Sequence, residues 1–178
     1  MPFEFAFLDW LYQFRNPVMN TISIFFDYAG AHGEIWIAFT LLLLLFRCTR
    51  KAGFAMAVAL VLYMAAGHFF LKPLFARPRP CDVNTAITIL VKRPHGHSFP
   101  SGHTASAFAA AFALWLQNRK LGVPALVLAA FIAFTRLYLY VHFPTDVLGG
   151  LVLGIALGFF ASWLVDSLAN KSKKKQSV

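Results

Sequence analysis

The sequence predicts an all-α membrane protein, a multi-pass bundle of about six transmembrane helices preceded by a helix at the membrane interface. Of its 178 residues, 59% are hydrophobic and 13% are charged, which is far more apolar than an average soluble domain. Because open strands cannot satisfy their backbone groups in lipid, the long apolar runs are expected to be helices. Each crossing uses about 20 residues, so the chain has room for a single domain, residues 1–178.

The N-terminal segment, residues 1–16, has the pattern of an amphipathic helix. Apolar residues recur at helical spacing, at Phe3, Phe7, Trp10, Leu11 and Phe14, and are interleaved with Glu4, Asp9, Gln13 and Arg15. Such a helix is expected to lie in the interface rather than to span. The next run, Pro17–Ala29, is short and contains Asp27, so the sequence leaves both five and six crossings open.

Later apolar runs are clearer crossings, at residues 34–46, 52–71, 101–116, 123–140 and 144–168. Lys and Arg residues follow the runs that end at residues 46, 116 and 168, which places all three groups on one side of the membrane. Since cytoplasmic loops are enriched in Lys and Arg, residues 169–178 are predicted to form a basic cytoplasmic tail that contacts membrane lipids. The other ends of the helices are then expected to face the periplasm or the exterior from the cell (inner) membrane.

The formal net charge of +9 does not indicate a nucleic-acid ligand, because the basic residues do not form a patch with stacking aromatics. The outer loop, residues 73–100, contains more cations than acids, namely Arg77, Arg79, Lys92 and Arg93 against Asp82. Together with Lys72 and Arg136 at neighbouring helix ends, this loop predicts a positive site for an anionic ligand. Cys48 and Cys81 are expected on opposite sides of the membrane, which argues against a disulfide.

Residues 98–104 read SFPSGHT and lead directly into an alanine-rich run. The backbone amides of Ser101, Gly102 and His103 are therefore expected at a helix N-terminus, where amides bind phosphate readily. Gly102 would let an oxyanion approach the backbone, and the Ser101 hydroxyl can donate a further hydrogen bond. Taken alone, the same stretch is more typical of a turn with a serine cap.

A second polar group lies where the run of residues 123–140 ends. On an unbroken helix, Arg136 and His142 would be rotated by about 240° and would point to different faces. Pro144 supplies a break, because it disfavours the helical conformation at Phe143 and suits the first position of a new helix. Asp146 then lies in the first turn, where it is expected to hydrogen-bond one ring nitrogen of His142 and leave the other facing the site.

With these residues in view, the chain resembles the type 2 phosphatidic acid phosphatase family, the PAP2 superfamily. The first family motif is Lys, six residues, Arg-Pro, and it is matched by Lys72, Arg79 and Pro80. The second, Pro-Ser-Gly-His, is matched by residues 100–103. The third is Ser-Arg, five residues, His, three residues, Asp, and it is matched by Arg136, His142 and Asp146, with Thr135 in place of the serine.

The resemblance implies a role for each of these residues. It implies that His142 attacks phosphorus and forms a phosphohistidine, that Asp146 orients His142, and that His103 protonates the leaving oxygen. It further implies that the phosphoryl oxygens are bound by Lys72, Arg79, Ser101, Gly102 and Arg136. Cations and amides then perform the task that Mg²⁺ performs in many phosphotransferases, so no metal and no cofactor are expected. Opposite protonation states of His142 and His103 predict a bell-shaped pH dependence.

The implied activity is hydrolysis of a terminal phosphate from a membrane lipid phosphate or diphosphate, with undecaprenyl diphosphate favoured by the similarity to small bacterial members. Phosphatidylglycerophosphate, phosphatidate, diacylglycerol diphosphate and a lipid A phosphate stay open as alternatives. A transporter or binding scaffold would need the cations but not both histidines. His95 and His97, with Lys92 and Arg93, are candidates for a second phosphate of the substrate, and the role of His68 is left open.

Overall fold

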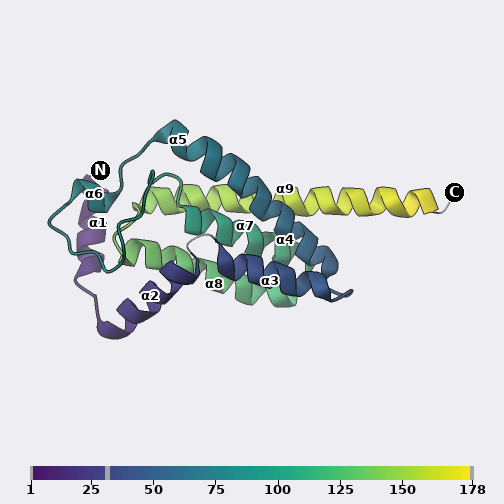
Figure 1. Cartoon of the computed structure of the whole chain (residues 1–178), viewed down its shortest axis with the longest axis horizontal. Helices are drawn as coiled ribbons and strands as arrows, with labels where there is room; N and C mark the ends of the chain where they lie inside the picture. Colours follow the sequence, from purple (N-terminus) through teal and green to yellow (C-terminus); the bar gives the residue numbers. More distant parts are fainter. Residues whose placement is uncertain (1, 31–32, 177–178) are drawn as a thin grey trace.

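The computed structural model describes residues 2–30 and 33–176, and every regular element within them is helical. The helices of the N-terminal half are α1 (Pro2–Tyr12), α2 (Pro17–Ala29), α3 (Glu34–Leu45), α4 (Arg50–Tyr63), the π-helix η1 (Met64–Leu71) and α5 (Lys72–Phe75). The remaining helices are α6 (Pro80–Val83), α7 (Gly102–Gln117), α8 (Arg119–Tyr138) and α9 (Pro144–Gln176). Figure 1 shows α3, α7, α8 and α9 lying lengthwise in one elongated bundle, with α4 crossing them obliquely.

Three stretches are long and apolar enough to cross a membrane: Arg50–Val83, Arg119–Tyr138 and Pro144–Lys171. Helices α2 and α3 give a fourth when they are taken together as one bent span. Helix α7 has 16 residues, fewer than the roughly 20 that an isolated crossing requires. The expected six spans, which counted Pro17–Ala29 as a separate crossing, are therefore not confirmed.

Helix α7 forms the centre of the bundle and packs against α4, α8 and α9. Its Ala105, Ala109 and Ala113 are fully buried, and these small side chains let neighbouring backbones approach closely. Gly150, Gly154 and Gly158 of α9 face α7 and its N-cap, where an added Cβ would lie 2.6–2.8 Å from the carbonyl oxygens of Ser101, Ala105 and Ala109. This glycine stripe holds the start of α9 against the start of α7.

Helix α1 packs through a different face than the sequence pattern suggests. Phe3 and Trp10 are 79% and 54% exposed, whereas Leu8 is fully buried and Glu4 is only 8% exposed. The side chains of Phe3 and Trp10 thus point outward, whereas Leu11, which the pattern places on the same face, is buried. Glu4, which the pattern assigned to the polar face, points into the protein.

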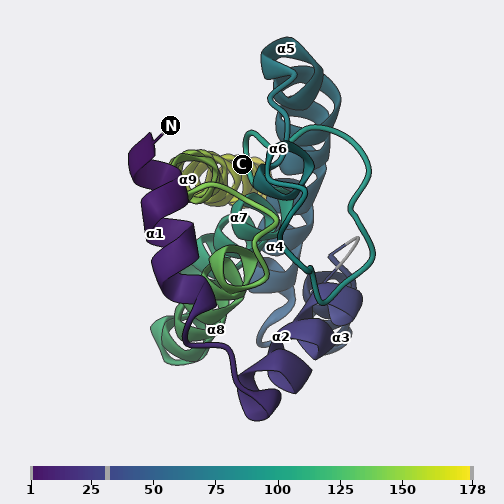
Figure 2. The same cartoon turned by 90° about the vertical axis from the view of Figure 1, so that its left-hand side faces the viewer.

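The helix ends that carry the predicted site gather at one end of the bundle. Figure 1 shows the end of α8, the start of α9 and the start of α7 near the α5–α6 segment, and the α3–α4 turn at the opposite end. Figure 2 looks onto the site end, where α1 lies along one side and the loop between α6 and α7 crosses in front of the helices. The topology therefore brings three separated sequence blocks together.

Candidate active site

His142 lies in the short connection between α8 and α9, and its neighbours fix its tautomer. Arg79 donates from Nη1 to Nε2 of His142 over 3.1 Å. Because a guanidinium can only donate, Nε2 presents its lone pair and the ring proton resides on Nδ1. Nδ1 faces the Ser98 hydroxyl at 3.4 Å and Oδ2 of Asp146 at 3.6 Å. The ring thus has an unprotonated nitrogen on the side of the cations.

Asp146 contacts His142 both directly and through Ser98. His142 Nδ1 lies 3.6 Å from Asp146 Oδ2, slightly longer than an ordinary hydrogen bond, so the two side chains are paired as the sequence predicts. Ser98 donates a short hydrogen bond to Oδ2, and the backbone N–H of Phe143 donates to the same oxygen over 2.8 Å. Sequence reasoning missed Ser98, although it belongs to the SFPSGHT stretch.

The environment of His142 keeps the imidazole uncharged. Its side chain is 3% exposed, and burial lowers its pKa from 6.5 to about 3. Removal from water disfavours the charged form of the ring, and nearby Arg79 and Lys72 act in the same direction. At neutral pH the ring therefore has the protonation state that a nucleophile requires.

The guanidinium of Arg79 is enclosed by backbone carbonyls as well as by His142. Nε donates to Gly96 over 3.1 Å, and Nη1 also donates to the Val141 carbonyl over 3.1 Å. Nη2 lies 3.5 Å and 3.4 Å from the carbonyl oxygens of His95 and His97. The backbone carbonyls of the outer loop thus position Arg79. His95 contributes its carbonyl to this contact, and the residue is exposed.

The N-terminus of α7 lies beside Lys72. A Cβ added to Gly102, the first residue of α7, would lie 3.4 Å from Lys72 Nζ, so the amine and the helix terminus share one small space. The amide of Ser101 is not available for a ligand, because it donates to the Asp146 carbonyl over 3.0 Å, which corrects the expectation for that amide. The Ser101 hydroxyl accepts from Thr104 over 3.0 Å and keeps its own proton for donation.

Arg136 and His103 are both held by Asp27 of α2. Arg136, 1% exposed, donates to the Asp27 carboxylate over 2.5 Å and to Thr135 Oγ1 over 2.9 Å and 3.2 Å. Thr135 therefore keeps the hydroxyl that the family motif supplies as serine. Nε2 of His103 lies 3.4 Å from the Asp27 carbonyl oxygen, which can only accept, so this nitrogen carries a proton and Nδ1 is left for the site. Asp27 was not predicted as a site residue.

Electrostatic interactions connect the predicted residues into one site. His103 interacts with Arg136, His142 and Lys72, and Lys72 interacts with Arg79 and Asp146. Within the described ranges 2–30 and 33–176, no group of three or more His, Cys, Asp or Glu side chains has the proximity needed to hold a metal ion. All eight predicted site residues thus lie together, although the amide of Ser101 is bonded to the Asp146 carbonyl.

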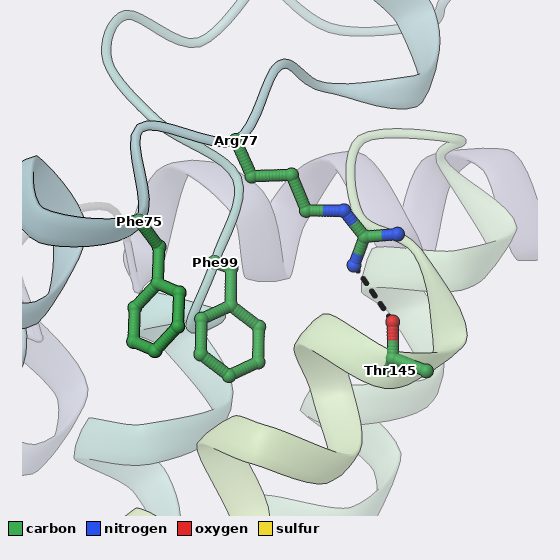
Figure 3. A pocket seen from close by; sticks show the side chains of 4 residues that line it. All are labelled: Phe75, Arg77, Phe99 and Thr145. Carbon is green, nitrogen blue, oxygen red and sulfur yellow. Dashed lines mark hydrogen bonds between the residues drawn. The ribbon is translucent and has the colours of Figure 1, made fainter. Parts of the chain in front are cut away.

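An open hollow of about 390 Å³ adjoins this site. It is lined by Phe75, Arg77, Phe99 and Thr145, and the rings of Phe75 and Phe99 meet edge to face with centroids 4.7 Å apart. Figure 3 shows Arg77 extending from the loop after α5 and donating to Thr145 at the start of α9. The hollow is therefore largely aromatic, with one cation at its rim.

Other polar residues singled out from the sequence lie outside this cluster. His68 is exposed and contacts the ring of Phe69 edge-on, with centroids 5.1 Å apart. Arg93 pairs with Asp82 at 3.4 Å, and both side chains are nearly half exposed. Lys92 is exposed on the same loop. Both cysteines are free, with Cys48 exposed and Cys81 buried.

Comparison with known families shows to which family the chain belongs. The family model described as the PAP2 superfamily matches residues 49–169. The chain belongs to the PAP2 superfamily. This PAP2 domain contains all three motifs, whereas α1, α2 and α3 precede it.

Relatives of this PAP2 chain include two undecaprenyl-diphosphatases and a lipid A 4'-phosphatase. It is 33% identical to the undecaprenyl-diphosphatase BcrC of Bacillus subtilis over 157 residues, which are 82% of this chain and 74% of that protein. It is 30% identical to an undecaprenyl-diphosphatase of Sulfolobus acidocaldarius over 80% of this chain and 69% of the other. A lipid A 4'-phosphatase of Bacteroides thetaiotaomicron is 32% identical over 89% of this chain and 80% of the other.

The fold is similar to those of solved PAP2 structures. LpxE of Aquifex aeolicus superimposes with a TM-score of 0.71 at 27% identity, covering 89% of this chain and 94% of the other. A PAP2-type phosphatidylglycerolphosphate phosphatase of Bacillus subtilis gives a TM-score of 0.69 at 24% identity, covering 93% and 84%. With its apolar helices, the chain is thus a membrane protein of a lipid phosphatase family.

Proposed function

We propose that this PAP2 protein hydrolyses the terminal phosphate of a lipid phosphate or diphosphate through a phosphohistidine on His142, without a metal ion. The observation that carries the proposal is the contact between Arg79 Nη1 and His142 Nε2 at 3.1 Å. This contact leaves Nε2 unprotonated next to a cation. Ser98 lies next to the other ring nitrogen, Nδ1, and donates to Asp146. This is the arrangement of an oriented nucleophile beside an oxyanion site.

The reaction proceeds in two steps of phosphoryl transfer. Nε2 of His142 forms a bond to phosphorus, and the bond from phosphorus to the lipid oxygen breaks. His103 enters this step as the imidazolium, with Nε2 still donating to the Asp27 carbonyl, and the lipid oxygen takes the proton from Nδ1. A water molecule then attacks phosphorus and gives its proton to His103, and phosphate leaves as the bond to Nε2 breaks. Proton transfer at each step is the contribution of His103.

The cations stabilise the charge on the phosphoryl oxygens. When a phosphoryl group lies next to Nε2, the guanidinium of Arg79 donates to its oxygens in place of the ring nitrogen. Lys72 and the Gly102 amide approach from α5 and α7, and Arg136 approaches from α8. Preorganised donors in a buried site act strongly because little solvent screens them.

We propose undecaprenyl diphosphate as the substrate. Two relatives named undecaprenyl-diphosphatase support this choice, and the exposed Lys92 and Arg93 in the outer loop suit a second phosphate. The lipid A phosphatase relatives make a lipid A phosphate the leading alternative, followed by phosphatidylglycerophosphate and phosphatidate. We further propose that the site faces the exterior or periplasm of the cell membrane, with the Lys-rich end of α9 in the cytoplasm.

A substrate panel in detergent tests the proposal. Initial rates of phosphate release are compared between undecaprenyl diphosphate, a lipid A phosphate and glycerophospholipid phosphates, with a chelator present. We expect release to persist with the chelator and to favour undecaprenyl diphosphate by tenfold or more in kcat/KM, about 1.4 kcal/mol of transition-state binding. An equal or greater preference for another lipid would overturn the substrate, and binding without release would indicate a scaffold or transporter.

The matched variants are His142→Ala and His68→Ala. We expect His142→Ala to abolish turnover while the protein stays folded and monodisperse in detergent. His68, exposed on η1, is the control and is expected to keep wild-type activity when replaced. Substantial turnover by His142→Ala would refute the nucleophile.

A further inference from the structure

Arg77 contacts Asp146 from the side opposite to His142. Nη1 of Arg77 donates to Asp146 Oδ1 over 2.6 Å and to Thr145 Oγ1 over 2.7 Å, and Nη2 donates to Glu4 Oε2 over 2.7 Å. The guanidinium carbon lies 4.2 Å from the centroid of the Phe143 ring. Although Arg77 counts among the cations of the outer loop, its terminal nitrogens are directed at protein groups rather than at a phosphate site.

The backbone of Arg77 also supports the residue that connects His142 with Asp146. The N–H of Ser98 donates to the Arg77 carbonyl over 2.8 Å. The Ser98 hydroxyl in turn donates to Asp146 Oδ2, the oxygen that faces His142. Arg77 therefore restrains both groups that orient the nucleophile, one through its side chain and one through its backbone.

Glu4 connects this array to the N-terminal helix. Its carboxylate pairs with Arg77 and accepts from Thr145 Oγ1 over 2.5 Å, at 8% exposure. Desolvating a carboxylate is costly, and an apolar side chain would pack α1 against the bundle without that cost. The rings of Phe5 in α1 and Phe143 meet edge to face, with centroids 5.3 Å apart. Helix α1 therefore packs against the same part of the protein that Glu4 contacts. Glu4 lies outside the residues matched to the PAP2 family, 49–169.

The geometry points to Arg77 as a positioning residue for the His142–Ser98–Asp146 array, held in place by Glu4, so that α1 is part of the active site. This inference rests on the proposed role of His142. Arg77 acts on the orientation of the nucleophile, whereas Lys72, Arg79 and Arg136 bind the phosphoryl group. Loss of Arg77 therefore slows the chemical step and leaves phosphate binding intact.

Steady-state kinetics of Arg77 variants separate these contributions. We expect Arg77→Ala to lower kcat by about 10- to 100-fold, the effect of a misplaced catalytic group, with KM and inhibition by inorganic phosphate unchanged. Arg77→Lys, which keeps the charge and most of the bulk, is expected to give an intermediate kcat with the same KM. Arg79→Gln, by contrast, should weaken inhibition by phosphate. A wild-type kcat in both Arg77 variants would overturn the inference.

Chemical rescue provides a readout that a general loss of packing would not give. Arg77 lines the open hollow of about 390 Å³, so a small cation from solution can reach its place in Arg77→Ala. Millimolar guanidinium is expected to restore kcat several-fold in Arg77→Ala, but not in wild type or in Arg79→Ala, and sodium chloride at the same concentration should have no effect. A fall in kcat that guanidinium does not restore, together with a raised KM, would show that Arg77 is only structural.

The link to α1 is tested with two carboxylates of that helix. Glu4→Gln is expected to lower kcat about threefold to tenfold, and to add nothing in an Arg77→Ala background, as expected for residues that act through one contact. Asp9→Asn is the matched control, because Asp9 anchors α1 by accepting from Tyr140 over 2.7 Å and does not contact Arg77. Equal losses of kcat in Glu4→Gln and Asp9→Asn would show that α1 affects activity only through its packing, and would contradict its inclusion in the active site.

The outcomes distinguish this inference from the proposed function. If His142→Ala keeps its turnover, the proposed nucleophile fails, and the inference fails with it. If His142→Ala is inactive while Arg77→Ala and Glu4→Gln keep wild-type kcat, only the positioning role is wrong.

Discussion

At the scale of single residues, the site depends on which nitrogen of His142 is unprotonated. Arg79 cannot accept a hydrogen bond, so its contact with Nε2 requires a lone pair there. Ser98 and Asp146 supply acceptors on the Nδ1 side. A network of this kind selects a tautomer.

Burial of His142 sets the acid side of the pH profile. The pKa of His142 is lowered to about 3, so the neutral, attacking form persists far below the ordinary value of 6.5. We expect the acid limb of kcat/KM that belongs to the nucleophile to lie well below pH 6.5, with the alkaline limb set by the acid His103. Initial rates from about pH 4 to pH 9 should show no acid limb of this origin, and should fall as rising pH removes the proton that His103 must donate. An acid limb centred near pH 6.5 that moves when Asp146 is replaced by Asn would contradict the assignment.

The lowered pKa of His142 also makes the free energy of unfolding depend on pH. The folded protein binds fewer protons at His142 than the unfolded chain between about pH 3 and pH 6.5. Its contribution to the free energy of unfolding is therefore complete above pH 6.5 and is lost as the pH falls. Rates at low pH should accordingly be taken from short incubations after a jump from neutral pH.

The sequence predicted the site residues that belong to short motifs with defined spacing. It missed residues that contact the site from distant parts of the chain. Arg79, His142 and Asp146 stand in patterned blocks, and the Pro144 break that separates Arg136 from His142 is confirmed by the start of α9. Ser98 was seen only as part of a turn and Arg77 only as a loop cation. Their contacts are with residues distant in the sequence, and no local pattern contains that information.

At the scale of helices, the glycine stripe on α9 determines how closely α7 can approach. In a membrane, the hydrophobic effect does not drive helices together, so close packing of small residues carries the association. Gly150 faces the carbonyl of Ser101, and Gly154 faces that of Ala105. The stripe thus fixes the position of the α7 N-terminus against Asp146.

Gly154→Ala should therefore destabilise the bundle. The added Cβ would lie 2.6 Å from the Ala105 carbonyl oxygen and 2.8 Å from Phe108 Cβ, so backbone must shift. Overpacking of this kind typically costs about 1–3 kcal/mol, and we expect a lower midpoint of thermal unfolding in detergent. Ala156→Val, on the exposed side of α9, is the matched control and should unfold at the wild-type temperature. An unchanged midpoint for Gly154→Ala would exclude the stripe as a packing determinant.

Helix boundaries were predicted where apolar runs end sharply and missed where polar residues continue a helix. The run predicted at 34–46 corresponds to α3 (Glu34–Leu45), whereas α8 begins at Arg119 and not at 123. There, Asn118 caps the helix by accepting from the Leu121 N–H, so the basic residues Arg119 and Lys120 belong to its first turn. The π-helix η1 was not predicted, since hydrophobic periodicity does not distinguish its wide turns from those of an α-helix.

At the scale of the whole molecule, three sequence blocks from five helices form one cationic site at one end of the bundle. Each block ends a helix or begins one, so charged groups lie at the bundle end and the apolar runs stay in the interior (Figure 1). The N-terminal helices complete the site from outside the PAP2 domain, α1 through Glu4 and α2 through Asp27. The proposed mechanism requires that His142 is the group that receives the phosphoryl.

Rapid acid-free quenching of the wild-type protein with a lipid diphosphate labelled in its terminal phosphate tests that claim most directly. The account predicts label on the peptide that contains His142, stable in alkali and lost in acid, which forms at least as fast as turnover and is absent from His142→Ala. Label on a different residue, or turnover faster than labelling of His142, would contradict it.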